Sequence, residues 1–299
     1  MTLVEHCVVF DCAGAPLVGI VAVPARVSPV GVVIVVGGPQ YRVGSHRQFT
    51  LLARYLASQG HAVMRFDYRG MGDSGMGDSG GAKPDFLGVN DDIAAAVAAL
   101  QKTVPQVTSV ALWGLCDGAS AALLYAGDMP PCSLAGLCLL NPWVRSAHSQ
   151  ATAQVKHYYT RRLRERDFWV KLLRGRVGLG RLTELAGSVR TVLAARRASR
   201  QPAPPQMGFQ QRMALAWRRA DCPLFLVLSG NDLTAKEFTD TLATDAAWRT
   251  ALAHPQLTRL DLPDADHTFS DTAARLAVEQ ATLGWLSRLA TPAGSPGAP

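Results

Sequence analysis

The chain has 299 residues, enough for one large α/β domain with an insertion or for two small domains. Hydrophobic residues make up 48% of it, so it can bury a sizeable core, and no run of about 20 apolar residues suggests a membrane-spanning helix. The net charge is +7. The six cysteines include no C-x-x-C pair and the histidines are not clustered, which argues against a disulfide framework and a zinc site. The first residues lack a basic region followed by an apolar one, so we expect no secretory signal and a cytoplasmic protein.

Strands and helices alternate along the chain. We expect strands at Val4–Phe10 and Leu17–Val23, joined by a turn, and a strand buried on both faces at the β-branched run Val30–Val36. A helix follows at Ser45–Ser58, with Ser45 as its cap and Gly60 as its stop. The alternation continues at His61–Phe66 (strand), Asp85–Lys102 (helix), Val107–Trp113 (strand), Ala119–Ala126 (helix) and Leu134–Leu140 (strand), then at Pro223–Leu228 and Leu257–Leu260 (strands) and Thr272–Leu289 (helix). This order predicts an α/β fold with a mostly parallel central sheet and helices on both faces.

Residues 142–220 interrupt the alternation. They contain helical stretches at Thr152–Arg174 and Leu182–Arg200 but no convincing strand, so we expect a helical cap inserted into a core made of residues 1–141 and 221–289. Residues 290–299 are rich in Pro, Gly and Ala and are expected to be a disordered tail. A five-residue repeat, Met71–Gly75 followed by Met76–Gly80, indicates a loop insertion rather than a repeat architecture.

The basic residues are concentrated in the predicted cap, where 17 lysines and arginines stand against three acidic residues. Such a surface suits an acidic or phosphorylated partner, for example an acyl carrier protein or a coenzyme A thioester. Peripheral membrane contact is an alternative, because apolar residues interleave with the basic ones at residues 168–173, and a merely solvated helical surface is another. No nucleic-acid recognition motif is present, so nucleic acid is the less favoured partner.

The segment Gly114–Gly118 reads Gly-Leu-Cys-Asp-Gly between an apolar run and an Ala-rich segment. A strand, a G-x-nucleophile-x-G turn and a helix form a nucleophile elbow, whose turn is too tight for side chains beside the nucleophile. The nucleophile here would be the thiol of Cys116, placed where a helix N-terminus favours a thiolate. The alternative is a buried cysteine in a Gly-rich turn.

A thiol that attacks an acyl carbonyl needs a base and an orienting acid. Asp232 follows the strand Pro223–Leu228 and His267 follows the strand Leu257–Leu260, which places both at the sheet edge where Cys116 emerges. Asp232 could instead cap the next helix. Asp240 is the rival acid, Asn141 occupies the place of an acid after the earlier strand, and His254 is the rival histidine.

An oxyanion hole should use the N–H of Asp117 and one from the loop after the third strand, where Gly38 is the better donor because Pro39 has none. Gln40 and Arg42 in that loop are candidates for substrate binding. The Asp117 carboxylate would disfavour a thiolate on Cys116 unless it points away, or it could bind an arginine or a substrate group.

Several motifs together resemble the α/β-hydrolase superfamily. The stretch Asp67–Ser74 matches D-x-R-G-x-G-x-S, and it joins the elbow, Gly230–Asp232 and Asp266–His267. Within the superfamily the chain is similar to the exosortase A system-associated hydrolases of the first type, on the residues Gly37–Arg47, Trp113–Ser120 and Asn141–Arg145. That resemblance implies a bacterial system for sorting surface proteins and making exopolysaccharide. The cysteine nucleophile also resembles that of dienelactone hydrolases, although the long basic cap argues against that group.

These observations predict an acyl hydrolase of esters or thioesters that works through a thioester on Cys116. An acyltransferase with the same Cys–His–Asp residues, a non-catalytic binding or scaffold protein, and a redox-sensing thiol with Cys132 or Cys138 as partner are the alternatives. No metal or nucleotide cofactor is expected.

Overall fold

The computed structural model describes residues 3–37, 40–74, 86–128, 134–145 and 207–290. The contacts divide the chain into two compact units, one made of residues 1–144 and 208–299 and the other of residues 145–207. The second unit falls almost wholly outside the described residues. So do the predicted helices at 152–174 and 182–200, the second copy of the five-residue repeat and nearly all of the predicted tail.

The first unit is built on an eight-stranded sheet. The strands are β1 (Leu3–Cys12), β2 (Ala15–Pro24), β3 (Val30–Val35), β4 (Val63–Phe66), β5 (Ser109–Leu115), β6 (Leu134–Leu140), β7 (Leu224–Ser229) and β8 (Leu257–Leu262). Their order is β1-β2-β4-β3-β5-β6-β7-β8, and only the pairs β1–β2 and β2–β4 are antiparallel. The predicted mostly parallel α/β sheet is therefore confirmed.

Burial along the strands follows their place in the sheet. Every residue of β3 and β7 is buried, as the apolar runs Val30–Val35 and Leu224–Ser229 predict for strands covered on both faces. The edge strand β8 instead exposes Arg259 and Asp261, which form an ion pair of 2.9 Å. Charges on an edge strand discourage pairing with other strands.

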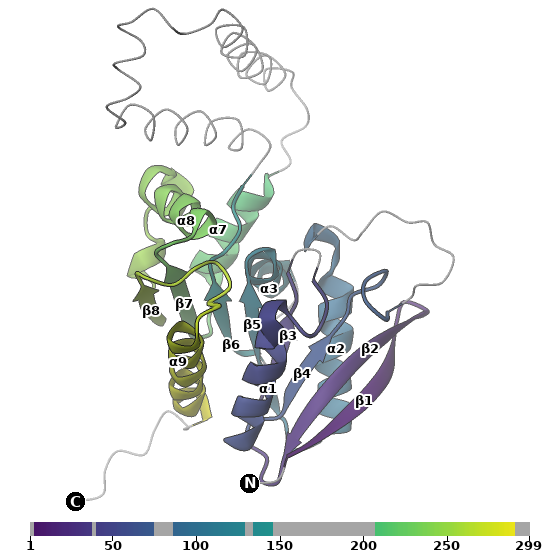
Figure 1. Cartoon of the computed structure of the whole chain (residues 1–299). Helices are drawn as coiled ribbons and strands as arrows, with labels where there is room; N and C mark the ends of the chain where they lie inside the picture. Colours follow the sequence, from purple (N-terminus) through teal and green to yellow (C-terminus); the bar gives the residue numbers. More distant parts are fainter. Residues whose placement is uncertain (1–2, 38–39, 75–85, 129–133, 146–206, 291–299) are drawn as a thin grey trace, which may run out of the picture. The chain divides into compact units, whose positions relative to one another are not determined.

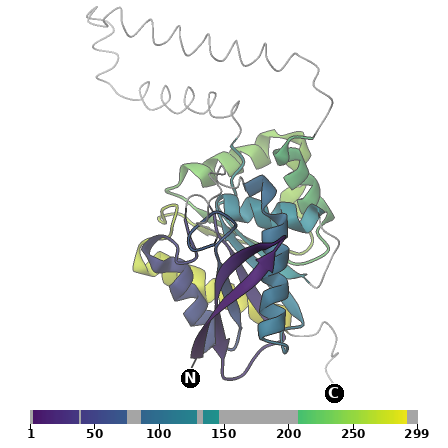
Figure 2. The same ribbon diagram turned by 90° about the vertical axis from the view of Figure 1, so that its right-hand side faces the viewer.

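Helices cover both faces of the sheet, with α1 and α9 together on one face and α2 and α3 on the other (Figures 1 and 2). The α-helices are α1 (Gln48–Ser58), α2 (Asn90–Thr103), α3 (Asp117–Asp128), α7 (Phe209–Arg219), α8 (Leu233–Thr244) and α9 (Thr272–Ala290). Short 3-10 turns occur at η1 (Ser45–Arg47), η2 (Phe86–Gly88), η3 (Ala246–Trp248) and η4 (Ala251–Ala253).

The helix predicted at Ser45–Ser58 begins three residues later, at Gln48. Ser45 instead opens the turn η1, and no side-chain cap is present at the start of either element, so the predicted Ser45 cap is wrong. The reason is the backbone: His46 and Arg47 have φ angles of +52° and +60°, a left-handed conformation that a helix cannot contain.

Helix α7 belongs to the first unit, although we expected its residues to lie in the insertion. Trp217 on α7 is completely buried, packs on Trp248 and Phe238 with ring centroids 5.8 and 6.2 Å away, and donates from its indole nitrogen to the carbonyl oxygen of Ala251 at 2.9 Å. This aromatic cluster fixes α7 to α8 and η3. The contacts thus begin the second unit at Arg145 and end it at Met207.

Candidate active site

Cys116 lies in a sharp turn between β5 and α3. Its φ angle is +61°, the left-handed conformation that a nucleophile elbow imposes on the residue at its tip. Its N–H donates to the carbonyl oxygen of Leu140 at 2.9 Å, and its own carbonyl accepts from the N–H of Trp143 at 3.2 Å. The turn is therefore tied to the end of β6, and the side chain of Cys116 is partly exposed.

The glycines on both sides of Cys116 are required by close backbone contacts. A β-carbon at Gly114 would lie 2.5 Å from the carbonyl oxygen of Gly118, and one at Gly118 would lie 2.4 Å from the carbonyl oxygen of Val35. Both obstacles are backbone atoms, which cannot rotate away as a side chain can. The spacing Gly-x-Cys-x-Gly is thus imposed by the close approach of β5 to the start of α3 and of α3 to β3.

Asp232 and His267 come together at the same edge of the sheet, although 35 positions separate them. Asp232 follows β7 and His267 lies in the loop between β8 and α9. The imidazole Nδ1 of His267 is 2.9 Å from Oδ2 of Asp232, and the Asp232 side chain is 6% exposed. The sequence therefore predicted the pairing of this acid with this histidine correctly.

Asp232 also caps α8, the alternative that its position allowed, while it bonds to His267. Oδ1 accepts from the N–H of Thr234 at 3.1 Å, and Oδ2 accepts from the N–H of Ala235 at 3.0 Å. Burial alone would raise the pKa of Asp232, but the hydrogen bond and charge of His267 and these two backbone N–H groups outweigh it and lower the pKa below its usual value. The carboxylate is held ionised.

The pKa of His267 is raised to about 10. The largest cause is its hydrogen bond with Asp232, the next is a hydrogen bond with Cys116, and burial acts in the opposite direction without cancelling them. The imidazole is thus positioned between a carboxylate and the thiol of the elbow residue. This arrangement allows the imidazole to accept a proton from the thiol.

The predicted oxyanion hole is only partly within the described residues. Asp117 is the first residue of α3, where backbone N–H groups point out of the helix towards negative charge. The second predicted donor, Gly38, lies outside the described residues. The Asp117 carboxylate lies against Gly37, because a β-carbon at Gly37 would be 2.3 Å from Asp117 Oδ1. The pKa of the buried Tyr68 is raised well above its usual value, first by burial and second by the negative charge of Asp117.

Arg42 is bound within the protein. Its guanidinium pairs with Asp67 and Asp73, and the backbone N–H of Arg42 donates to Asp67 Oδ1 at 2.7 Å. Gln40 accepts from the N–H of Ser45 at 3.2 Å, inside the same loop. Both candidate substrate-binding side chains therefore hold the loop in place, and Asp67 serves as the buried anchor of the motif Asp67–Ser74.

The rival residues lie elsewhere. Asp240 is within α8, as expected, and His254 bonds through Nε2 to the carbonyl oxygen of Ala220 at 3.0 Å. Asp266, beside His267, accepts from the N–H groups of Thr268 and Ser270 at 3.1 and 2.9 Å and so shapes the loop that carries the histidine. This role was not predicted, since an Asp next to a His in a sequence does not show which backbone groups it reaches.

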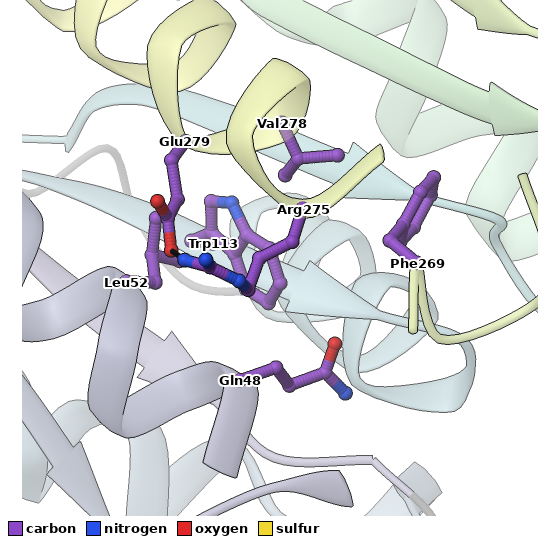
Figure 3. Close-up of a pocket in the computed structure, with 7 residues that line it drawn as sticks. All are labelled: Gln48, Leu52, Trp113, Phe269, Arg275, Val278 and Glu279. Carbon is purple, nitrogen blue, oxygen red and sulfur yellow. Dashed lines mark hydrogen bonds and ion pairs between the residues drawn. The ribbon is translucent and has the colours of Figure 1, made fainter. Parts of the chain in front are cut away.

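A cavity of about 20 Å³, large enough for about one water molecule, lies between α1, β5 and α9 (Figure 3). Its walls include the ion pair of Arg275 with Glu279, at 2.7 Å. The residues that line it are Gln48, Leu52, Trp113, Phe269, Arg275, Val278 and Glu279. Cys116, Asp232 and His267 are not among them, so this cavity does not provide a substrate site.

Across the described ranges, no group of three or more His, Cys, Asp or Glu side chains could hold a metal ion. In the same residues, no helix combines the length and the apolar character that crossing a membrane requires.

Comparison with known proteins places this chain in a family. Residues 28–192 match the family model described as serine aminopeptidase, S33, which is more than half of the chain. The chain belongs to the serine aminopeptidase S33 family. The resemblance to α/β-hydrolases is thereby confirmed, and the predicted nucleophile position of this S33 chain holds a cysteine. None of the curated proteins matches it.

Solved structures share the fold of this S33 chain. An esterase from Pyrococcus furiosus superposes with a TM-score of 0.62 at 15% identity, over 96% of this chain and 91% of the esterase. A dienelactone hydrolase from Anabaena variabilis gives 0.61 at 14% identity, over 96% and 99%. An acylaminoacyl peptidase from Pyrococcus horikoshii gives 0.63 at 14% identity, over 100% of this chain and 44% of the peptidase. At these identities the likeness shows the fold alone.

Proposed function

We propose that this S33-family chain is an acyl hydrolase of esters or thioesters whose nucleophile is the thiol of Cys116. The observation that carries the proposal is the position of the His267 imidazole, which bonds to Asp232 at 2.9 Å and interacts with Cys116. The strained backbone of Cys116 supports it, because a left-handed residue flanked by obligatory glycines is costly unless it presents a side chain for use.

In the first half of the reaction, the Cys116 sulfur attacks the acyl carbonyl carbon and forms a C–S bond. His267 takes the thiol proton, or already holds it in an ion pair, and Asp232 stabilises the charge on the imidazole. The negative charge on the carbonyl oxygen is stabilised by the N–H of Asp117 at the start of α3 and, in our proposal, by the N–H of Gly38. The bond to the leaving group then breaks, and the leaving alkoxide or thiolate takes the proton from His267.

In the second half, neutral His267 removes a proton from a water molecule, whose oxygen attacks the thioester carbonyl. The C–S bond breaks, the carboxylic acid leaves, and the Cys116 thiolate and the His267 imidazolium are restored. A thiolate is a good leaving group as well as a good nucleophile, which suits exchange with another thioester. For this reason we include thioesters among the substrates.

We further propose the exosortase-associated group as the subfamily, on the residues Gly37–Arg47, Trp113–Ser120 and Asn141–Arg145. An acidic acyl carrier protein or coenzyme A would match the 17 basic residues that we counted between positions 142 and 220. Adding carrier-bound donors to the assay below tests this partner.

The test is intact-mass spectrometry after incubation with acyl thioesters and p-nitrophenyl esters. We expect an acyl adduct on the wild type that Cys116→Ala lacks. The matched control is Cys7→Ser, because Cys7 is an exposed thiol on β1 and should not contribute. Loss of the adduct in buffer indicates hydrolysis, and persistence until an acceptor is added indicates transfer. An adduct that remains in Cys116→Ala, or no adduct and no turnover with any donor, would contradict the proposal.

A further inference from the structure

A fully buried amide connects the ends of two strands to the loop that carries His267. Asn141 follows β6, its exposure is 0%, and its Nδ2 donates to Ser229 Oγ at 2.7 Å and to the backbone carbonyl oxygen of His267 at 3.1 Å. Its Oδ1 accepts from the N–H of Ser229 at 2.9 Å. One side chain therefore links the ends of β6 and β7 to the loop that carries His267.

The backbone of Asn141 is as unusual as its side-chain bonds. Its φ angle is +44°, and its N–H donates to the carbonyl oxygen of Val227 at 3.0 Å. Asn is among the few residues besides Gly that adopt this left-handed conformation readily. The position therefore selects for a residue that tolerates the turn and also offers both a donor and an acceptor.

The chemistry of an amide fits these partners and that of a carboxylate does not. The Nδ2 group has two protons, one for the Ser229 hydroxyl and one for the His267 carbonyl, while Oδ1 serves the Ser229 N–H. An ionised carboxylate of the same shape could accept from Ser229 but would face the His267 carbonyl oxygen with a second acceptor. An acid at this place would thus push the histidine loop away.

We propose that Asn141 is a positioning residue that sets where the His267 imidazole lies between Asp232 and Cys116. It acts through the His267 main chain and touches neither the thiol nor the imidazole ring. The inference rests on the proposed function, since it concerns the pairing of His267 with Cys116. Displacement of such a pair by about 1 Å can cost on the order of 100-fold in rate.

The experiment measures the alkylation rate of Cys116 by iodoacetamide at pH 6.5, read from the mass of the Cys116 peptide so that the exposed Cys7 is counted separately. Asn141→Gly keeps the left-handed backbone and removes the bonds to both partners. Ser229→Ala is the matched control, because it removes a buried bond of Asn141 but leaves the bond to His267. Thermal unfolding of both variants shows whether they fold.

We expect His267→Ala to react at least about 10-fold more slowly than wild type, Asn141→Gly to approach that rate, and Ser229→Ala to stay near wild type. If Asn141→Gly does not fold, Asn141→Asp takes its place, since Asp keeps the shape and loses the donor. A wild-type rate in a folded Asn141 variant, or an equal fall in Ser229→Ala, overturns the inference. Equal rates for wild type and His267→Ala would instead refute the proposed function.

Discussion

The double role of Asp232 can be separated by one substitution and a matched control. Asp232→Asn keeps an oxygen for the cap of α8, and Asn is as good a cap residue as Asp. It provides one acceptor oxygen where the structure uses two, for the N–H groups of Thr234 and Ala235 and for Nδ1 of His267. The amide also lacks the charge that stabilises a protonated imidazole.

The control is Asp271→Asn at the start of α9. Asp271 accepts from the N–H groups two and three residues later, at 2.8 and 3.2 Å, as Asp232 does, and no histidine is bonded to it. We expect Asp271→Asn to cost less than about 0.5 kcal/mol of unfolding free energy, because Asn and Asp cap equally well. Asp232→Asn should cost about 1–2 kcal/mol more, the contribution of a hydrogen bond between charged groups after solvent screening of the partly exposed His267.

Activity should separate the two variants much further. Removing the group that orients a catalytic histidine lowers turnover by roughly 10²- to 10⁴-fold, so we expect such a fall for Asp232→Asn and wild-type turnover for Asp271→Asn. Initial rates with a p-nitrophenyl ester and urea unfolding of the same preparations provide both numbers. Turnover of Asp232→Asn within threefold of Asp271→Asn would show that Asp232 is only a helix cap.

Three further predictions concern the same site. The pKa of His267 is raised from 6.5 to about 10, so the stability that its positive charge contributes is complete below about pH 6.5 and is lost as the pH rises through 10. The melting temperature of the wild type should therefore approach that of His267→Gln as the pH rises over this range. A difference between the two melting temperatures that stays constant would disprove the shift. Gly118→Ala should destabilise by about 1–3 kcal/mol through contact with the Val35 carbonyl oxygen, whereas Gly284→Ala, with open space around it, should not destabilise, as urea unfolding of both would show. Asp67→Asn should destabilise by about 2–4 kcal/mol because it removes the charge of a buried carboxylate that pairs with the partly exposed Arg42, and a loss under 1 kcal/mol in calorimetry would contradict that role.

The centre of the sheet was predictable because its inner strands include apolar runs with clear limits. The runs at 30–36 and 223–228 contain no polar residue that could shift their register, and they form β3 and β7 within one residue of the expected bounds. The glycines around Cys116 also allowed the elbow to be predicted, because positions with close backbone contacts require glycine and glycine is visible in the sequence. Candidates at strand ends, such as His267, followed from the parallel topology.

Other features depend on contacts between distant residues, which a single sequence does not show. Arg42 was a candidate for substrate binding, but Asp67, 25 positions later, binds it. Helix α7 was assigned to the insertion because residues 142–220 contain no convincing strand, yet the buried face with Trp217 decides its place. Asn141 was considered only as a missing acid, because the groups that its amide reaches lie 88 and 126 positions away.

The chain leaves the first unit after Val144 and returns at Gly208, and these two points are close neighbours. The side chain of Gln210, two residues after the return, donates to the carbonyl oxygen of Val144 at 3.3 Å. A segment inserted between two such points does not have to cover a long distance. Doubling the length of such a segment costs only about 0.6 kcal/mol of loop-closure free energy. The connection to residues 145–207 therefore places little strain on the scaffold that holds Cys116, Asp232 and His267.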